Sequence, residues 1–264
     1  MKEELKALEK NKTWVIVQLP KDKKPVGCRC VYKIKYNSDG TIERYKARLV
    51  AKGYTQTYGI DYQETFAPVA KMNTVRILLS VAINNGWNLY QMDVKNAFLQ
   101  GTLEEEVYMT LPPGHIKEND TNIVCRLNKS IYGLKQSSRA WYGKLSHFLI
   151  YCGFKVSQSD TSLFSKHENN DTTIILVYVD DIIITGNNYE KINEVKKYLK
   201  EKFEIKDLGR LKYFLGIEIT HSTKGLFISQ RKYTLDLLKE TGKLGSKPAS
   251  TPIDSKILLN FKDL

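Results

Sequence analysis

The sequence predicts a globular chain that alternates helices and strands, and three observations support this. Hydrophobic residues make up 42% of the 264 residues, which is enough for a sizeable core in one or two domains. Segments with helical spacing of apolar residues alternate with segments rich in β-branched and aromatic residues. Glycine, asparagine and aspartate residues that favour turns separate these segments, and the chain has no internal repeat or low-complexity linker.

The first part of the chain is predicted to hold two helices and a hairpin. The segment "EELKALEKN" has the spacing of a short amphipathic helix. Two strand-like stretches, "CRCVYKIKY" and "RYKARLVA", flank Asp39-Gly40, a strong hairpin-turn signal. A second helix, "NTVRILLSVAINNGW", is expected to begin at the capping residues Asn73 and Thr74 and to end at Gly86.

The rest of the chain continues this alternation. The segment "NLYQMDV" reads as an alternating strand, and a helix capped by Ser137 and Ser138 is expected over "RAWYGKLSHFLIYCGF". The stretch "TTIILVYVDDIIITG" predicts two strands joined by a turn. A basic helix "YEKINEVKKYLKEKF", a strand "LKYFLGIEI", a hairpin into "GLFISQ" and a helix "QRKYTLDLLKETG" complete the prediction.

The charge of the chain favours a polyanionic partner. Lysine and arginine number 41 against 29 acidic residues, a net charge of +12, which suits nucleic acid, with a membrane surface as the alternative. No apolar run approaches the roughly 20 residues that span a bilayer, and the charged start of the chain lacks a signal core. We therefore expect a soluble intracellular protein whose four cysteines are reduced structural thiols without zinc spacing.

Two adjacent carboxylates, Asp180 and Asp181, interrupt an apolar strand pair. Taken alone, the pair favours an ordinary polar turn over a functional site, because aspartate is common in turns. Strand alternation places Asp93 at the end of a half-buried strand, on the face opposite Met92 and Val94. Three carboxylates on neighbouring strands repel one another unless cations hold them, and oxygen ligands suit magnesium or manganese. Two such ions would support phosphoryl chemistry.

Five motifs carry a resemblance to a known family. The segments "YKARLVAKGYTQ", "QMDVKNAFLQGTLEEEVYM", "SIYGLKQSSRAWY", "YVDD" and "LKYFLGIEI" occur in the order found in copia-type retrotransposon reverse transcriptases. The chain resembles this family from "LKALEKNKTW" to "ASTPI", which is nearly its whole length. The resemblance implies an α+β right-hand polymerase with an RRM-like palm, fingers and a truncated thumb.

The resemblance also implies a division of the chain into polymerase subdomains. The fingers would comprise residues 1–86, with the hairpin at 29–50 and the first palm helix, and residues 103–136. The palm would comprise residues 87–102 and 137–222, and residues 223–264 would begin an incomplete thumb.

The family's catalytic residues map onto the acids of this chain. Asp93, Asp180 and Asp181 would bind two Mg²⁺ ions, with Mn²⁺ as a substitute, and Val94 would add a backbone carbonyl. Val179 would occupy the tight turn, where a β-branched residue is strained. Tyr178 would pack beneath the primer or template.

Phe98 matches the position whose ring closes the sugar pocket, so the resemblance implies deoxynucleotide substrates. The alternative is that Phe98 is a core residue of "NAFL". The basic hairpin would fold over the triphosphate through Lys35, Lys46 and Arg48, or it is a solvated basic surface. The loop before the "SSRAWY" helix would supply further contacts to the nucleotide, namely Tyr132, Gly133 and Gln136.

Two further positions follow from the resemblance. Leu215 and Gly216 would lie near the primer's terminal phosphates, or this stretch is an apolar strand that closes the palm. Lys206, one lysine among many, is a weaker candidate for the general acid that protonates pyrophosphate.

The function implied is an RNA- and DNA-directed DNA polymerase that works with an RNA template, a DNA primer/template and dNTPs. Other parts of a Pol polyprotein, such as integrase and ribonuclease H, are expected partners, and a membrane is not. The expected location is the cytoplasm, including virus-like particles. The alternative is a catalytically inactive nucleic-acid-binding remnant, which would still bind in a salt-dependent manner.

Overall fold

The structure is a computed structural model that describes residues 1–37, 40–114, 122–222 and 225–249. The described residues up to Arg210 form one compact unit, and those from Leu211 onward form a second. Helices and antiparallel sheets occur in both units, which confirms the α+β class. Among the described residues, no helix is long and apolar enough to cross a bilayer.

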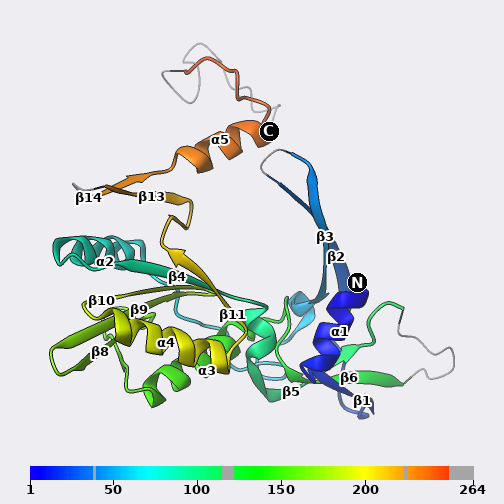
Figure 1. The fold of residues 1–264 in the computed structure, drawn as a ribbon. Helices are drawn as coiled ribbons and strands as arrows, with labels where there is room; N and C mark the ends of the chain where they lie inside the picture. The colour runs from blue at the N-terminus through cyan, green and yellow to red at the C-terminus, as the bar shows by residue number, and fades with distance from the viewer. Residues whose placement is uncertain (38–39, 115–121, 223–224, 250–264) are drawn as a thin grey trace, which may run out of the picture. The chain divides into compact units, whose positions relative to one another are not determined.

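A six-stranded antiparallel sheet is the centre of the first unit (Figure 1). Its strand order is β11-β4-β10-β9-β8-β7, so strands distant in sequence pair at its centre. The strands are β4 (Leu89–Val94), β7 (Lys155–Val156), β8 (Leu163–Glu168), β9 (Asp171–Tyr178), β10 (Asp181–Gly186) and β11 (Ile205–Arg210).

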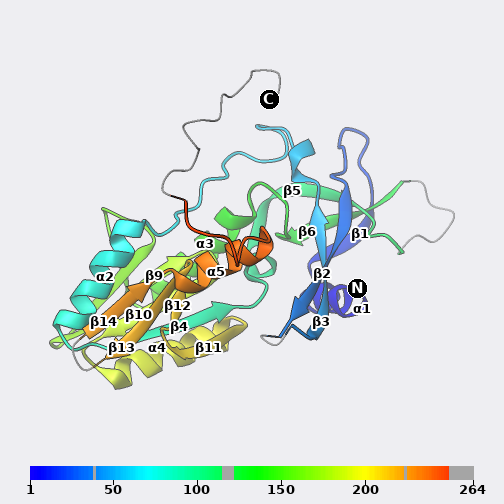
Figure 2. The ribbon, with the colours of Figure 1, turned by 90° about the horizontal axis from the view of Figure 1, so that it is seen from above.

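Helices cover both faces of this sheet. Helix α2 (Met72–Asn84) lies on one face, and α3 (Ser137–Tyr151) and α4 (Tyr189–Lys202) lie on the other (Figures 1 and 2). The predicted face of β4, with Tyr90, Met92 and Val94, packs in the core with residues of α3 and α4. The expectation that β4 is only half-buried is wrong, because Leu89 and Gln91 on its second face are also buried.

A smaller sheet and a long hairpin occupy the rest of the first unit. The sheet has the order β1-β6-β5, and the hairpin pairs β2 with β3. Leu8 of the N-terminal helix and Leu49 of β3 share a buried cluster with Met109 of β5. The elements are α1 (Lys2–Lys10), β1 (Trp14–Gln18), β2 (Cys28–Tyr36), β3 (Ile42–Ala51), the 3-10 turns η1 (Gly53–Thr55) and η2 (Ala97–Gln100), β5 (Thr102–Thr110) and β6 (Ile123–Lys129).

The second unit contains a three-stranded sheet and one helix among its described residues. These are β12 (Tyr213–Phe214), β13 (Ile217–Ser222), β14 (Gly225–Ser229) and α5 (Arg231–Glu240). The single strand expected over "LKYFLGIEI" is wrong. Leu215 and Gly216 have φ angles of 51° and 79°, and this left-handed backbone turns the chain between β12 and β13.

The side-chain capping predicted at two helix starts is wrong, although α3 begins at Ser137 as expected. Helix α2 begins at Met72 and α3 at Ser137, and neither has a side-chain cap. The expected capping hydroxyls have tertiary partners instead, since Thr74 donates to Asp160 and Ser137 donates to the carbonyl of Ile131. The end of α2 before Gly86 and the hairpin strands are confirmed, whereas Asp39 lies outside the described residues.

The buried carboxylate of Asp160 connects α2 to the loop before β8. It accepts hydrogen bonds from the backbone N–H groups of Lys71 and Ser162 at 3.1 and 3.0 Å. The hydroxyls of Thr74 and Ser162 also donate to it, at 2.5 and 2.6 Å. Burial alone would raise the pKa of Asp160, but these four hydrogen bonds outweigh it and lower the pKa.

We predict that Asp160→Ala lowers the free energy of unfolding by about 2–4 kcal/mol at pH 7, because it leaves buried donors without acceptors. Since the folded-state pKa is depressed, the contribution of this carboxylate is full well above the unfolded pKa of about 3.9 and is lost as the pH falls from there through the lower folded-state pKa. Urea denaturation at pH 7 and at about pH 2.5 measures both effects. Asp22→Ala, at an exposed position, is the control, and an equal loss at both pH values would contradict the prediction.

Candidate active site

Two of the three predicted acids face each other across the central strands. In the antiparallel pairing of β4 with β10, Asp93 lies directly opposite Asp181. Opposed residues of such a pair point to the same face, so these two carboxylates are neighbours. The carbonyl of Asp180 accepts a hydrogen bond from the N–H of Val94 at 2.8 Å, which fixes the turn against the end of β4.

The carboxylate of Asp181 is held by a residue that the sequence analysis did not single out. The side-chain amide of Gln91 donates to Oδ1 of Asp181 at 3.0 Å. Burial raises the pKa of Asp181, and the negative charges of Asp180 and Asp93 raise it further, although the Gln91 bond opposes them. This carboxylate therefore lies where a bound cation would be stabilising. The sequence does contain a signal for Gln91, because it is a polar residue two positions before Asp93 in an otherwise apolar strand.

The turn between β9 and β10 is strained and has a buried anchor. Val179 has a φ angle of 55°, the left-handed region that β-branched residues avoid. The indole N–H of Trp141 donates to the carbonyl of Val179 at 2.7 Å. Trp141 is buried in α3 and packs edge-on against Phe203, with ring centroids 5.3 Å apart. A rigid core residue thus fixes the backbone directly before the two acids. Helical spacing identified Trp141 as a core residue, but spacing carries no information about its N–H partner.

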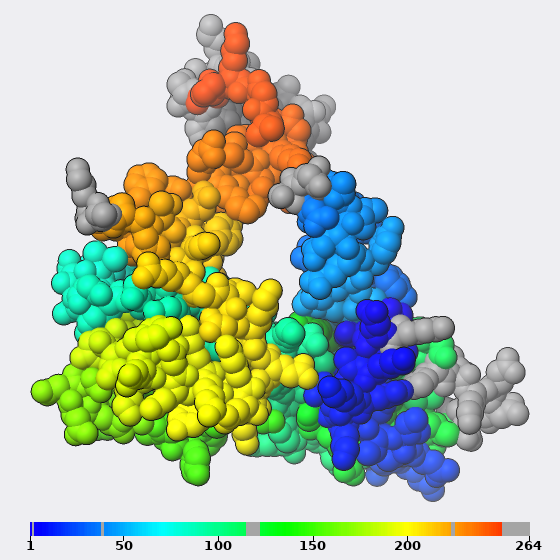
Figure 3. All heavy atoms as spheres, viewed as in Figure 1, coloured from blue at the N-terminus to red at the C-terminus, as the bar shows by residue number. Residues whose placement is uncertain are grey.

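The β2–β3 hairpin has one basic face, and it projects from the first unit (Figure 3). Lys33 pairs with Lys46, Lys35 with Arg44, and Val31 with Arg48, so all the basic residues of these pairs share one face. Strand alternation alone predicts that Lys33 shares a face with Lys35, and that Lys46 shares a face with Arg48. The strand register shows that both pairs lie on the same face of the hairpin.

Arg48 begins a stack of side chains at the base of this face. Its guanidinium carbon lies 4.2 Å from the centre of the Tyr132 ring, and the Tyr132 and Phe98 rings meet edge-on at 4.9 Å. Nε of Arg48 is the one buried side-chain nitrogen or oxygen atom of the described chain that has no hydrogen-bond partner. Burial raises the pKa of Tyr132, Arg48 lowers it, and the charges of Asp180 and Asp93 raise it, so the stack lies near the acids.

The structure gives Gly133 and Gln136 roles inside the protein. Gly133 has a φ angle of 92°, and a Cβ there would lie 2.2 Å from the carbonyl oxygen of Ala51, so only glycine fits. Gln136 is 2% exposed. Its Oε1 accepts a hydrogen bond from Gln56, and its Nε2 donates to the carbonyl of Asp61. Both residues support the loop that holds Tyr132.

The remaining predicted residues lie in three places. Tyr178 is half-buried at the end of β9, opposite Asp181 in the strand register. Lys206 of β11 lies opposite Asp93, so Lys206, Asp93 and Asp181 follow one another across three adjacent strands. Leu215 and Gly216 belong to the second unit.

Asp93 and Asp181 bring carboxylate oxygens to these strand ends. Within the described ranges, no three aspartate, glutamate, histidine or cysteine side chains are close enough to form a ready-made metal site. The donor set nevertheless fits magnesium, because Asp93 and the half-buried Asp181 supply oxygen ligands whose mutual repulsion a divalent ion would relieve.

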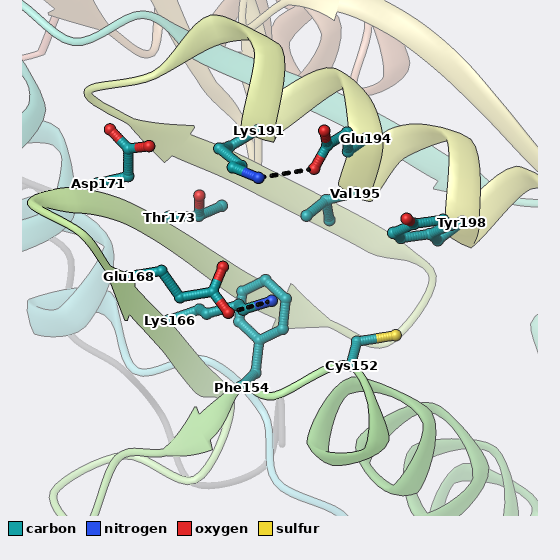
Figure 4. Close-up of a pocket in the computed structure, with 10 residues that line it drawn as sticks. All are labelled: Cys152, Phe154, Lys166, Glu168, Asp171, Thr173, Lys191, Glu194, Val195 and Tyr198. Atoms are coloured by element: carbon teal, nitrogen blue, oxygen red, sulfur yellow. Dashed lines mark hydrogen bonds and ion pairs between the residues drawn. The ribbon is translucent and has the colours of Figure 1, made fainter.

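A small pocket lies at the far end of β9 from these acids (Figure 4). Lys166 pairs there with Glu168 at 3.0 Å, and Lys191 pairs with Glu194 at 3.2 Å. Its lysines are therefore neutralised within the protein, and we assign it no ligand.

Comparison with known proteins identifies the family. Residues 11–255 match the family model described as "Reverse transcriptase (RNA-dependent DNA polymerase)". The chain is 49% identical over 254 residues to the retrovirus-related Pol polyprotein from transposon RE1 of Arabidopsis thaliana, covering 96% of this chain and 17% of the relative. It is 41% identical over 265 residues to the Pol polyprotein from transposon TNT 1-94 of Nicotiana tabacum, covering 99% of this chain and 20% of the relative. The chain therefore belongs to the reverse transcriptase family, in its copia-type form. It spans about a fifth of the length of these polyproteins.

We predict that Trp141→Phe lowers the free energy of unfolding by about 1–3 kcal/mol, because the carbonyl of Val179 loses its donor. The amide resonances of Asp180 and Asp181 should broaden or shift in an NMR spectrum, since the strained turn is no longer fixed. Phe203→Leu is the control, because it removes the ring contact but keeps the hydrogen bond. Unchanged resonances of the two acids in Trp141→Phe would show that the indole does not hold the turn.

Proposed function

We propose that the chain is an RNA- and DNA-directed DNA polymerase that extends a primer 3′-hydroxyl with dNTPs. The observation that carries this proposal is the pairing of Asp93 with Asp181 at the end of the central strands, near the Arg48–Tyr132–Phe98 stack. Acids that can hold cations therefore lie beside a basic and aromatic surface that suits a nucleotide.

The acids have the clearest role in this proposal. Asp93, Asp180 and Asp181 would hold two Mg²⁺ ions, or Mn²⁺ in their place, with the backbone carbonyl of Val94 as a further ligand. When bound, such ions activate the attacking hydroxyl and stabilise the leaving pyrophosphate. Gln91 orients Asp181, and Trp141 fixes the turn that carries Asp180.

The basic face of the hairpin would bind the triphosphate. Arg48 offers an unpartnered Nε–H beside Tyr132, and a buried donor without a partner favours a ligand that supplies the acceptor. Burial lowers the pKa of Lys46, and the positive charges of Arg48, Arg44 and Lys35 lower it further. A bound triphosphate would relieve this repulsion among the cations. Tyr132 would form the floor of the nucleotide pocket, with Gly133 and Gln136 as its support.

Two side chains would act on the sugar and the leaving group. Phe98 is half-buried, with one side packed on the core and an edge against Tyr132, so a core role and a sugar-contact role are compatible. Its ring would exclude a ribose 2′-hydroxyl and select dNTPs. Lys206, which lies opposite Asp93, would protonate the departing pyrophosphate.

The remaining assignments complete the proposal. Tyr178, Leu215 and Gly216 would contact the primer and template. The six-stranded sheet with its helices, together with β12 and β13, would be the palm. The β2–β3 hairpin and the β1-β6-β5 sheet would be fingers, and the thumb would begin at residue 223. The two plant relatives are Pol polyproteins, so we propose integrase and ribonuclease H regions as partners, and the cytoplasm or virus-like particles as the location.

We predict that Asp180→Asn combined with Asp181→Asn lowers primer extension on the order of 10³-fold. The assay uses a poly(rA)/oligo(dT) template with Mg²⁺ or Mn²⁺. Glu3→Gln combined with Asp22→Asn removes the same charge at exposed positions and should leave extension unchanged.

A binding assay distinguishes polymerase activity from the alternative function, a nucleic-acid-binding remnant. Fluorescence anisotropy measures the affinity of the chain for the duplex. A folded wild-type chain that binds the duplex but does not extend the primer would contradict polymerase activity and indicate a binding remnant.

We predict that Phe98→Val raises the ratio of ribonucleotide to deoxynucleotide incorporation by about 10-fold or more, because a smaller side chain admits the 2′-hydroxyl. Single-nucleotide extension with UTP and dTTP measures the ratio. Phe148→Leu, another half-buried ring that packs on the same core, should leave it unchanged. If the ratio does not rise in Phe98→Val, the sugar-gate assignment is wrong.

A further inference from the structure

A lysine-rich pocket lies on the opposite side of the six-stranded sheet from the acids. Its cavity volume is about 530 Å³, and its lining comes from the ends of β6 and α4, from α3 and from the segment after β4. Asp93 points away from α3 and α4, because Met92 and Val94 face these helices. The lysines that line the pocket are Lys95, Lys129, Lys144, Lys200 and Lys202.

Most of these lysines lack a counter-charge within the protein. Lys200 is the exception, because it pairs with Asp207 at 3.3 Å. For Lys95, Lys129, Lys144 and Lys202, no acidic group of the described chain lies within ion-pair distance. Two glutamates, Glu201 and Glu204, also line the pocket, which leaves its lining with a formal charge of +3 from five lysines and two glutamates.

Lys144 lies at the centre of helix α3 and is half-buried, as is Lys129, whereas Lys95, Lys200 and Lys202 are exposed. Burial of Lys144, together with the positive charges of Lys129 and Lys202, lowers its pKa. Three ammonium groups thus gather in a concave site without a partner. Like charges gathered in this way favour a bound anion, which would relieve their mutual repulsion.

We propose that this lysine pocket binds phosphate groups. Lysine is a compact point charge, and several lysines together suit an anion that carries more than one charge. The aromatic ring in the lining, Phe203, is buried and offers no exposed face on which a base can stack. The pocket therefore recognises phosphate charge and not nucleobases, whether the phosphate is free or part of a nucleic-acid backbone.

The first test uses inorganic pyrophosphate as the probe, measured by isothermal titration calorimetry on the intact chain. EDTA is present, so that pyrophosphate cannot bind through metal ions at the acids. Replacing Lys129, Lys144 and Lys202 together by glutamine should weaken binding at least about 10-fold, since three charge-assisted contacts are removed. The matched control replaces the exposed Lys6, Lys24 and Lys155 by glutamine and should bind as the wild type does.

The second test distinguishes the source of the phosphate. The affinity for an RNA–DNA duplex is measured at several salt concentrations for the same three proteins. If the pocket takes a nucleic-acid backbone, the log–log salt slope of the pocket variant should fall by about 2, whereas the control slope falls less. Weakened pyrophosphate binding with an unchanged slope would assign the pocket to free phosphates.

Two results would overturn the proposal. One is equal weakening in the pocket and control variants, which would show a general charge effect. The other is a wild type that binds no pyrophosphate and a pocket variant with the wild-type salt slope. Lys144→Arg keeps the charge and should bind pyrophosphate as the wild type does, which excludes misfolding as the cause of a loss. None of these readouts depends on polymerase activity, so they leave the proposed function to its own experiments.

Discussion

The antiparallel pairing of β4 with β10 is the constraint on which the rest of the site depends. Its register places Asp93 opposite Asp181, and a slip of one residue would turn one of the two carboxylates to the other face of the sheet. Burial of Met92, Ile182 and Ile184 with residues of α3 and α4 maintains this register, because a slip would turn these side chains away from the core that they form with the two helices. The hydrophobic core therefore fixes the geometry of the acids, although Met92, Ile182 and Ile184 have no chemical role of their own.

The same sheet explains why carboxylates at this position are tolerated. Asp181 is half-buried beside two other acids, which is unfavourable to its charge. The bond from Gln91 offsets part of this, and the bond from Trp141 to Val179 keeps the turn in a conformation that valine alone would avoid. The hydrogen bonds from Gln91 and Trp141 thus offset the repulsion between the acids and the backbone strain at Val179.

Much of this could be predicted from the sequence, because the relevant signals are local. The alternation in "NLYQMDV" gives the face of Asp93, and the apolar runs around Asp180 and Asp181 give the two strands and their turn. The capping rules gave a wrong prediction where a residue distant in sequence binds the hydroxyl that was expected to cap the helix. Thr74 and Ser137 read as helix caps, but Asp160 and the carbonyl of Ile131 take their hydroxyls. The partners of Gln136 and Trp141 are distant in sequence, so no spacing rule could reveal them.

The close approach of Gly133 to Ala51 has a mechanical consequence. The N–H of Ala51 donates to the carbonyl of Tyr132 at 2.8 Å, and no side chain fits between the two backbones. Strand β3, which carries Arg48, is therefore joined at its base to the loop that carries Tyr132. When the base of the hairpin shifts, the guanidinium and the ring beneath it travel together as one rigid body, and any hinge within the hairpin must lie beyond Arg48, toward its tip.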